Sequence, residues 1–404
     1  MSTLTDPPVQ SFQFSMLWND TRYRSYTFQA IALFLLIGAL AYLANNLVQN
    51  LAAAGLNISY NFLGEPAGYD INQRPIEYYS QSSHMRAAIV GILNTLIVAV
   101  LGCITATIIG VTAGVLRLSN NWIVRQLMAV YVEAFRNVPV LIWILIIFFV
   151  MTAALPAPRA FRGEEPQASM LFEAFAFTNR GVYIPKPVWG EGSMVVAIVF
   201  LVSIIGVIAY RRYTTKLLYE TGQLLPRGWP TLAILFVPTI LAFFIMERPI
   251  TLAYPELKGF NFAGGIQIRG SLIALWFALA IYTGAFIAEN VRAGIQAINR
   301  GQTEAAASLG LRPGRIMNLV ILPQALRVII PPLISQYLNL TKNSSLAIAV
   351  GYMDITGTLG GITLNQTGRA IETVLLLMLF YLTISLSISA AMNVYNNAVK
   401  LKER

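Results

Sequence analysis

The sequence is poor in the residues that most often carry covalent and metal chemistry. Its 404 residues include a single cysteine, Cys103, and a single histidine, His84. One cysteine cannot form a disulfide framework or a metal cluster within the chain. The sequence also lacks a phosphate-binding loop of the form Gly-x-x-x-x-Gly-Lys-Ser/Thr, so it cannot hydrolyse ATP by that route. We therefore expect that the chain is not an enzyme and holds no cofactor or metal of its own.

Charged residues are also scarce. Only 11% of the residues are charged and 56% are apolar, with a mean hydropathy of +0.63, whereas soluble domains carry about 25% charged residues. A soluble globule of this size would lack the polar surface that it needs, so the composition indicates a membrane protein. The net charge of +10 would also suit a nucleic-acid surface, and the placement of the charges decides between the two.

Eight apolar runs are long enough to cross a bilayer, which takes about 20 residues per helix. The sequence therefore predicts an all-α polytopic membrane protein. The first run could instead be a cleaved signal peptide, but about 27 residues precede it and it is long for a signal sequence, which favours a retained span. The predicted spans are Phe28–Val48, Ala88–Leu116, Leu127–Ala153, Ser193–Tyr210, Thr231–Met246, Gly270–Asn290, Val328–Gly351 and Ala370–Tyr395.

The charges match a topology with both termini in the cytoplasm. The inside segments then hold 16 basic and 5 acidic residues, and the outside segments hold ten of each. Lysine and arginine gather on the cytoplasmic side of membrane proteins. The basic excess is therefore a sign of topology, and no nucleic-acid partner is expected.

Long loops and extra spans divide the chain into four predicted parts. Residues 1–87 form the cytoplasmic N-terminus, the first span and an outer loop, and residues 88–153 form the first part of a core. Residues 154–269 form an insertion with outer loops and two extra spans, and residues 270–404 form the second part of the core. The outer loops are rich in glycine, proline, tyrosine and asparagine, and we interpret them as an outer cap.

The largest inside loop contains a predicted short helix. Thr303 can cap its start, and Glu304 suits the positive N-terminal end of a helix. Alanines, the strongest helix formers, follow. Gly310 can adopt the positive φ that ends a helix, and Pro313 prevents its continuation. The sequence thus predicts a helix with small side chains outside the membrane, able to approach another protein closely.

This loop resembles the EAA loop of binding-protein-dependent ABC importers. The match consists of Glu304-Ala305-Ala306, Gly310 six residues after the glutamate, and Ile321-Leu322-Pro323, whose proline lies thirteen residues after the glycine. In that family the loop docks into a groove of the ATPase subunit. The resemblance implies coupling roles for Gly301, Glu304, Ala305, Ala306, Gly310, Leu322 and Pro323. An ordinary amphipathic connector between two spans is the alternative.

Three more segments extend the resemblance over roughly two-thirds of the chain: residues 91–96, 133–139 and 342–346. The last is similar to the Lys-Asn/Asp-Thr-Ser-Leu pattern of polar amino-acid permeases, with Ser344 in place of the usual threonine. The resemblance implies a type I ABC importer (MetI-like) core made by the second, third, sixth, seventh and eighth spans. Long chains of this kind are similar to permeases of general L-amino-acid importers.

The resemblance also implies the partners of the chain. It would be a permease subunit in the bacterial inner membrane that moves polar L-amino acids into the cytoplasm. ATP and Mg would be bound by a separate ABC ATPase dimer, and a periplasmic amino-acid-binding protein would deliver the substrate. The second permease would be either an identical chain or, as is usual for general amino-acid importers, a related one.

Charged side chains inside membrane spans are costly and mark candidate sites. Glu133 and Arg136 share one predicted helix face and precede Pro139, which can loosen the backbone. We interpret them as a self-neutralising pair or as a contact with substrate or a gate. Glu289 and Arg292 have the same spacing, and we interpret them as an interfacial ion pair that steadies the coupling loop.

Lys342 lies well inside the seventh predicted span, in a stretch too polar to face lipid. It could attract a substrate carboxylate, or it could pair with Glu133 or another buried acid. The predicted substrate pathway gathers residues of three predicted spans, the second, third and seventh: Asn94, Thr95, Glu133, Arg136, Pro139, Asn339, Lys342, Asn343, Ser344 and Ser345.

Two other functions fit parts of the sequence. An ion-driven secondary transporter tends to have inverted repeats and broken helices, and no repeat is evident here. A membrane scaffold that docks a cytoplasmic partner would have no need of the polar stretch around Lys342. The ATP-driven importer is therefore the function that we expect.

Overall fold

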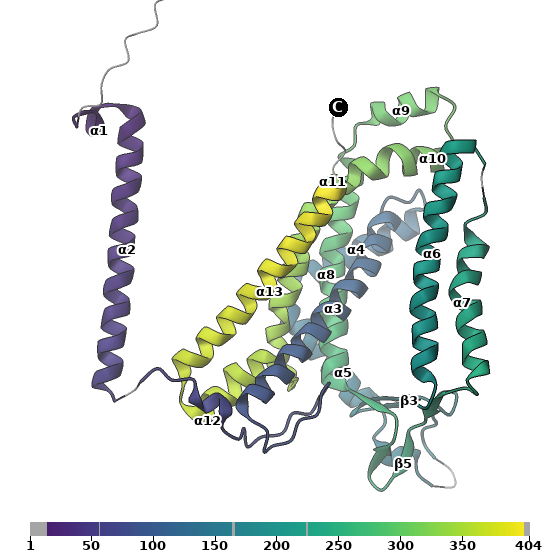
Figure 1. Cartoon of the computed structure of the whole chain (residues 1–404), viewed down its shortest axis with the longest axis horizontal. Helices are drawn as coiled ribbons and strands as arrows, with labels where there is room; N and C mark the ends of the chain where they lie inside the picture. Colours follow the sequence, from purple (N-terminus) through teal and green to yellow (C-terminus); the bar gives the residue numbers. More distant parts are fainter. Residues whose placement is uncertain (1–13, 56, 164–165, 224, 400–404) are drawn as a thin grey trace, which may run out of the picture. The chain divides into compact units, whose positions relative to one another are not determined.

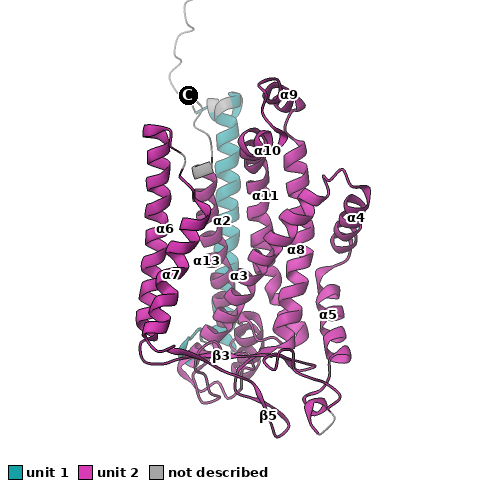
Figure 2. Cartoon of the chain, turned by 90° about the vertical axis from the view of Figure 1, so that its right-hand side faces the viewer, with its two compact units in different colours: residues 1–61 teal, residues 62–404 magenta. Residues whose placement is uncertain are grey.

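The computed structural model describes residues 14–55, 57–163, 166–223 and 225–399. The chain forms two compact units, residues 1–61 and residues 62–404, which Figure 2 shows in separate colours. Eight helices in the described residues are long and apolar enough to cross a membrane. The predicted class, an all-α polytopic membrane protein with eight spans, is thereby confirmed.

The described residues of the first unit form a short helix, α1 Met16–Asn19, and a long one, α2 Thr21–Ala53. The rings of Trp18 and Phe28 meet edge to face, with their centroids 5.8 Å apart, so α1 packs against the start of α2. Within this unit α2 is a continuous membrane-length helix, as expected of the first predicted span.

Long helices form the frame of the second unit. They are α3 His84–Leu116, α8 Gly270–Gln296, α11 Leu322–Asn343 and α13 Ala370–Val399. The closest packing is between α3 and α8, where a Cβ added to Gly110 would lie 2.5 Å from the Cβ of Ile287. Only glycine allows two helix backbones to come so close. Leu340 of α11 lies against Gly102, near the middle of α3.

The third predicted span is broken, which corrects the prediction of one helix over Leu127–Ala153. It consists of α4 Trp122–Asn137 and α5 Val140–Ala154, which follow one another along α8 (Figure 2). Val138 is extended, with φ −112° and ψ 134°, because the residue before a proline avoids the helical conformation and Pro139 has no N–H to donate. Tyr131 donates a 2.6 Å hydrogen bond to the carbonyl of Ile281, which holds α4 against the middle of α8.

The seventh predicted span begins earlier than expected and is irregular at both ends. It runs over Pro313–Val350, through α10 Pro313–Ile316, the π-helix η3 Met317–Ile321, α11 and the 3-10 helix η4 Ser344–Val350. A second π-helix, η5 Thr356–Thr363, and the short α12 Leu364–Thr367 then lead into α13. Near the start of α13, Glu372 pairs with Arg369 at 3.4 Å.

The predicted insertion forms two helices and a small β-structure. Helices α6 Ser193–Thr221 and α7 Gly228–Ile245 pack against each other. Residues 155–163, 166–192 and 246–269, which we call the cap, add the 3-10 helix η2 Pro158–Phe161 and three small antiparallel sheets. The strands are β1 Ala176–Thr178, β2 Gly181–Ile184 and β7 Ile266–Arg269, then β3 Lys186–Trp189 with β4 Ile250–Ala253, and β5 Glu256–Lys258 with β6 Asn261–Ala263.

The second unit has two distinct ends (Figure 1). The cap lies at one end, and helix α9 Arg300–Ser308 lies at the other. The 3-10 helix η1 Asn61–Gly64 and the loop after it pack on the cap end of α3, around buried Tyr69 and Tyr78. We refer below to the cap end and the α9 end.

Candidate transport and coupling sites

Helix α9 begins four residues earlier than expected. Its N-cap residue is Asn299, whose side-chain oxygen accepts a 2.8 Å hydrogen bond from the N–H of Gly301. The prediction that Thr303 caps this helix is therefore wrong, because asparagine is at least as strong a cap and stands first in the chain. Glu304 consequently lies one turn inside the helix, exposed to solvent. The prediction that Glu304 lies at the N-terminus of the helix is therefore also wrong.

The end of α9 follows the prediction. Gly310 has a φ of +76°, which a residue with a side chain rarely adopts, and Pro313 opens the next helix. Ala306 is buried against Ile316 and Ile321. The other predicted coupling residues of α9 and its following turn, Gly301, Glu304, Ala305 and Gly310, are exposed, whereas Leu322 is at the edge of exposure and Pro323 is half-buried.

A hollow of about 700 Å³ lies beside α9. Its wall includes Ile295 in the last turn of α8 and Ile298 just after that helix. Thr303 of α9, Ile316 of α10 and Met317 of η3 complete it. An exposed helix of small residues beside an apolar hollow is a surface suited to a second protein.

Three side chains form an ion-pair network where α3 and α8 approach α9. Glu289 accepts hydrogen bonds from Arg292 through both carboxylate oxygens, one of them at 3.1 Å from Nε, and from Nη1 of Arg117. The predicted Glu289–Arg292 pair is thus confirmed. Arg117, at the end of α3, was not predicted, because its partner lies 172 residues away and no local spacing signals such a contact.

The predicted Glu133–Arg136 pair is wrong. Among the described residues these two side chains form no ion pair within 4.0 Å. The guanidinium of Arg136 instead lies over the ring of Phe286 of α8, 5.2 Å from its centroid, and its Nε is buried without a hydrogen-bond partner. Glu133 is exposed and accepts a 3.4 Å hydrogen bond from Asn137. With Pro139 exposed at the break, a cation, an anion and an open helix end occur together where α4 meets α5, directly before the candidate span Val140–Phe161.

A polar stripe runs along the exposed face of α11. Ser335, Asn339 and Lys342 lie at positions i, i+4 and i+7 and are all exposed, so they share one side of the helix. Tyr337, on the opposite side of α11, forms a 2.7 Å hydrogen bond with Thr107 of α3, so α11 packs on α3 with the side that faces away from the stripe. In the part of the chain that the structure describes, Lys342 forms no ion pair, so the predicted pairing with Glu133 or another acid is wrong.

The remaining residues of the polar stretch turn inward. Asn343 and Ser345 are half-buried, and Ser344 is fully buried. The hydroxyl of Ser344 donates a 2.8 Å hydrogen bond to the carbonyl of Thr341. Only part of the predicted stretch therefore faces outward.

Asn94 and Thr95 of α3 are fully buried. The amide of Asn94 donates a 2.8 Å hydrogen bond to the carbonyl of Met353, and the N–H of Ile355 donates to the hydroxyl of Thr95 at 3.1 Å. These two residues therefore hold the turn before η5 against α3. Between the two bonds lies Asp354, which is fully buried, and burial raises the pKa of its carboxyl to about 6.

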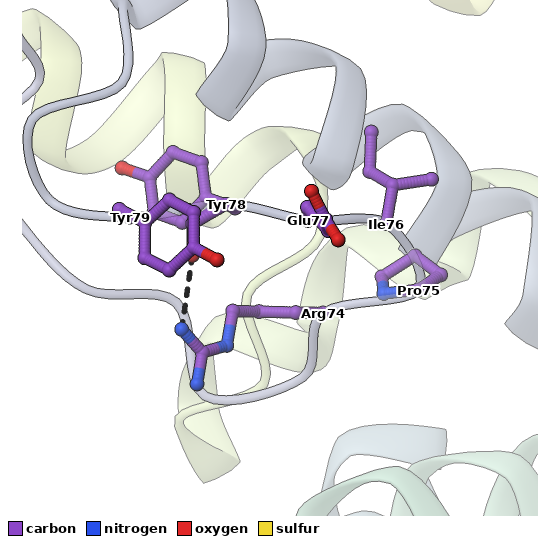
Figure 3. A pocket seen from close by; sticks show the side chains of 6 residues that line it. All are labelled: Arg74, Pro75, Ile76, Glu77, Tyr78 and Tyr79. Carbon is purple, nitrogen blue, oxygen red and sulfur yellow. Dashed lines mark hydrogen bonds between the residues drawn. The ribbon is translucent and has the colours of Figure 1, made fainter.

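The structure thus places the predicted pathway residues in three separate positions: the α3 contact with the turn before η5, the α4–α5 break, and the face of α11. A separate pocket lies outside all three positions. Residues 74–79 form a pocket of about 380 Å³ in the loop at the cap end, where Arg74 donates a 2.9 Å hydrogen bond to the carbonyl of Tyr78 (Figure 3). None of the predicted site residues lines that pocket. Among the described residues, no group of three or more histidine, cysteine, aspartate or glutamate side chains could hold a metal ion.

Comparison with known proteins gives one family. The model of the binding-protein-dependent transport system inner membrane component matches residues 203–401. The chain is 52% identical, over its full length and that of the relative, to the glutamate/glutamine/aspartate/asparagine transport system permease protein BztB of Rhodobacter capsulatus. It is 42% identical to the general L-amino acid transport system permease protein AapQ of Rhizobium johnstonii, over 95% of this chain and 94% of the relative.

A third relative is the putative amino-acid ABC transporter permease protein YhdX of Escherichia coli, 42% identical over 96% of this chain and 98% of the relative. All three are permease proteins, so ATP hydrolysis belongs to a different subunit. This agrees with the missing phosphate-binding loop and with the exposed α9 helix, which carries the EAA pattern. The chain belongs to the family of amino-acid ABC transporter permeases.

Proposed function

We propose that this permease forms part of a path for polar L-amino acids, lined by the exposed stripe of α11 and the break between α4 and α5. The stripe of Ser335, Asn339 and Lys342 carries the proposal. It lies in a membrane-length helix, on the side opposite the Tyr337 contact with α3. Lipid cannot satisfy polar groups at that depth, so the stripe must face water or a second subunit.

The charges on α11 and at the end of α4 suit amino-acid substrates. Lys342 and Arg136 supply positive charge for an α-carboxylate, and Glu133 supplies negative charge for an α-ammonium group. The relatives named for glutamate, glutamine, aspartate and asparagine, or for general L-amino acids, support a substrate of this polar class. Pro139, Asn339, Asn343 and Ser345 complete the proposed lining. Asn94, Thr95 and Ser344 act from behind it, by holding the irregular segments in place.

The proposed orientation places the α9 end in the cytoplasm and the cap end outside, in a bacterial inner membrane with both termini cytoplasmic. The excess of lysine and arginine in the segments at the α9 end supports it. An ABC ATPase dimer, which binds ATP and Mg, would dock on α9 through Gly301, Glu304, Ala305, Ala306 and Gly310, with Leu322 and Pro323 behind. A periplasmic amino-acid-binding protein would reach the cap end.

The second permease is proposed to be a related, non-identical chain. We expect that this protein, tagged and extracted gently from its native membrane, brings with it an ABC ATPase and a second permease, both identified by mass spectrometry. Recovery of the ATPase with this chain as the sole permease would establish a homodimer instead. The absence of any ATPase, under conditions that preserve other membrane complexes, would contradict the coupling through α9.

Arg136 provides a direct test of the path. We expect Arg136→Gln to lower ATP-driven uptake of the substrate amino acid about tenfold or more, because a hydrogen bond to a charged group contributes about 1.5–3 kcal/mol. The measurement is uptake of labelled amino acid by proteoliposomes that contain the purified complex. Arg125→Gln is the matched control, since Arg125 is an exposed cation on the same helix away from the break.

Two outcomes of that assay would contradict the proposal. Normal uptake by Arg136→Gln, at normal protein content, would remove Arg136 from the path. Uptake that proceeds without ATP and collapses when an ionophore dissipates the ion gradient would instead establish an ion-driven carrier, a class in which broken helices such as α4–α5 are common.

A further inference from the structure

The ion-pair network at the α9 end joins two helices that are far apart in sequence. Arg117 directly follows Leu116, the last residue of α3, whereas Glu289 and Arg292 lie about two turns and one turn before the end of α8. The three side chains are only 14%, 24% and 27% exposed. Arg292 grips both carboxylate oxygens of Glu289, while Arg117 reaches one of them through a single nitrogen.

The seam beneath this network is made of small residues. A Cβ added to Gly114 of α3 would lie 2.6 Å from the carbonyl oxygen of Ala288, and Ala113 and Ala285 are buried in the same contact. Small residues let two helices approach closely. Ile287 and Val291 of α8 sit over Gly110 and Gly114, and Trp276 of α8 donates a 3.1 Å hydrogen bond to Thr105 of α3, so the packing sets a register to which the network adds a charged link at the α9 end. A hydrogen-bonded ion pair with defined geometry fixes that register.

Helix α8 leads directly into α9. It ends at Gln296, and Asn299 already caps α9. Ile295 and Ile298 pack against the buried contact of Ala306 of α9, so α9 is attached to the end of α8 without a flexible linker. On the other side, Gly294 of α8 lies against Ile329 of α11. A displacement of α9 is therefore delivered to the end of α8, beside the network.

We propose that the Arg117–Glu289–Arg292 network holds α3 and α8 in one register, so that both helices move as a single body with α9 when the ATPase closes. The inference rests on the coupling of α9 to an ATPase. The three residues are positioning residues: they touch no substrate and no nucleotide. Loss of the network leaves the helices packed but removes the charged link at the α9 end of their contact. The end of α8 can then shift against α3, so ATP hydrolysis continues without productive movement of the path.

The first test compares uptake with ATP hydrolysis in the reconstituted complex. We expect Glu289→Gln to lower the amino acid imported per ATP hydrolysed about tenfold, a typical size for a coupling effect, while ATP hydrolysis stays within about twofold. Arg292→Lys has a similar effect because a lysine ammonium group cannot form the bidentate hydrogen bonds that the arginine guanidinium forms with both oxygens of a carboxylate. Arg117→Lys retains coupling because it needs one nitrogen only. A purely structural role would lower uptake and ATP hydrolysis together, and equal behaviour of the two lysine variants would overturn the assigned geometry.

The second test replaces the ion pair by a covalent link. In a Cys103→Ala background, Arg117→Cys combined with Glu289→Cys loses coupling, and a bifunctional thiol reagent that bridges the two cysteines restores it. A bridge that forms but leaves the complex uncoupled would show that α3 and α8 must separate during the cycle, and the proposal would be overturned.

A distance measurement keeps this proposal separate from the transport function. Spin labels at Asn120→Cys and Ala297→Cys, both exposed positions, report the distance between the ends of α3 and α8. The distance stays constant between nucleotide-free and ATP-bound complexes when the network is intact, and it changes between these states in Glu289→Gln. The spin-label distance could stay constant while the complex without substitutions imports no amino acid. That result would contradict the proposed substrate and leave the single-body proposal intact. A distance that changes in the intact complex would overturn the single-body proposal.

Discussion

Replacement of Glu304 by lysine is expected to abolish ATP-driven uptake while the protein still folds and inserts. Glu304 is exposed in the middle of α9, and in the described part of the chain it forms no ion pair. The fold therefore loses nothing when its charge is reversed. In an interface, leaving a buried charge without its partner costs about 2–5 kcal/mol, which weakens binding at least about 30-fold. The effect should fall on the ATPase contact.

Three measurements check this expectation. They are uptake of labelled amino acid, the amount of permease in the membrane, and the amount of ATPase that co-purifies with it. The control is Glu191→Lys, the same charge reversal at an exposed position in the cap, which should leave all three unchanged. Normal uptake and normal ATPase recovery with Glu304→Lys, at normal membrane content, would remove α9 from the coupling interface.

The spans could be predicted because each depends on one strong, local property. A run of about 20 apolar residues signals a membrane helix whatever surrounds it, and all eight runs overlap candidate membrane spans, although the third is broken between α4 and α5. The ends of the helices depend on competition between neighbours. Asn299 precedes Thr303 as a helix cap, and Pro139 ends α4 outright where the sequence suggested only a looser backbone. The cap strands, three or four residues each, are too short to leave a periodic signal.

The candidate site was harder to predict because it depends on contacts between distant segments. The spacing of Glu133 and Arg136 permits a pair, but Phe286 offers Arg136 a ring face, and a cation–π contact is favourable where few waters compete. The spacing of Glu289 and Arg292 permits the same pair, and there it forms. One rule therefore gave one wrong and one confirmed prediction, since the tertiary neighbour decides the outcome. Asn94 and Thr95 illustrate the same limit, because their partners in the turn before η5 lie about 260 residues away.

That turn underlies the second large effect. Gly91→Ala is expected to destabilise the contact between α3 and the turn before η5. A Cβ at position 91 would lie 2.2 Å from Oγ1 of Thr358 and 3.0 Å from both the carbonyl oxygen of Asp354 and Cα of Ile355. The threonine side chain can rotate only by giving up its 2.9 Å hydrogen bond to Asp354, and the two backbone atoms can move only with the whole turn. Moving the turn would also strain the hydrogen bonds from Asn94 and to Thr95.

The cost combines overpacking, about 1–3 kcal/mol, with buried polar groups left without partners, about 1–3 kcal/mol each. Gly91→Ala should therefore lower the midpoint of thermal unfolding of the detergent-purified protein and lower uptake with it. Gly38→Ala is the matched control, because Gly38 lies in the interior of α2 with nothing within 4 Å of an added Cβ. Alanine there favours the helix, so the midpoint should stay or rise. If Gly91→Ala unfolded at the wild-type temperature, the turn before η5 could not be packed against α3, and the buried positions of Asn94, Thr95 and Asp354 would all have to be reassigned.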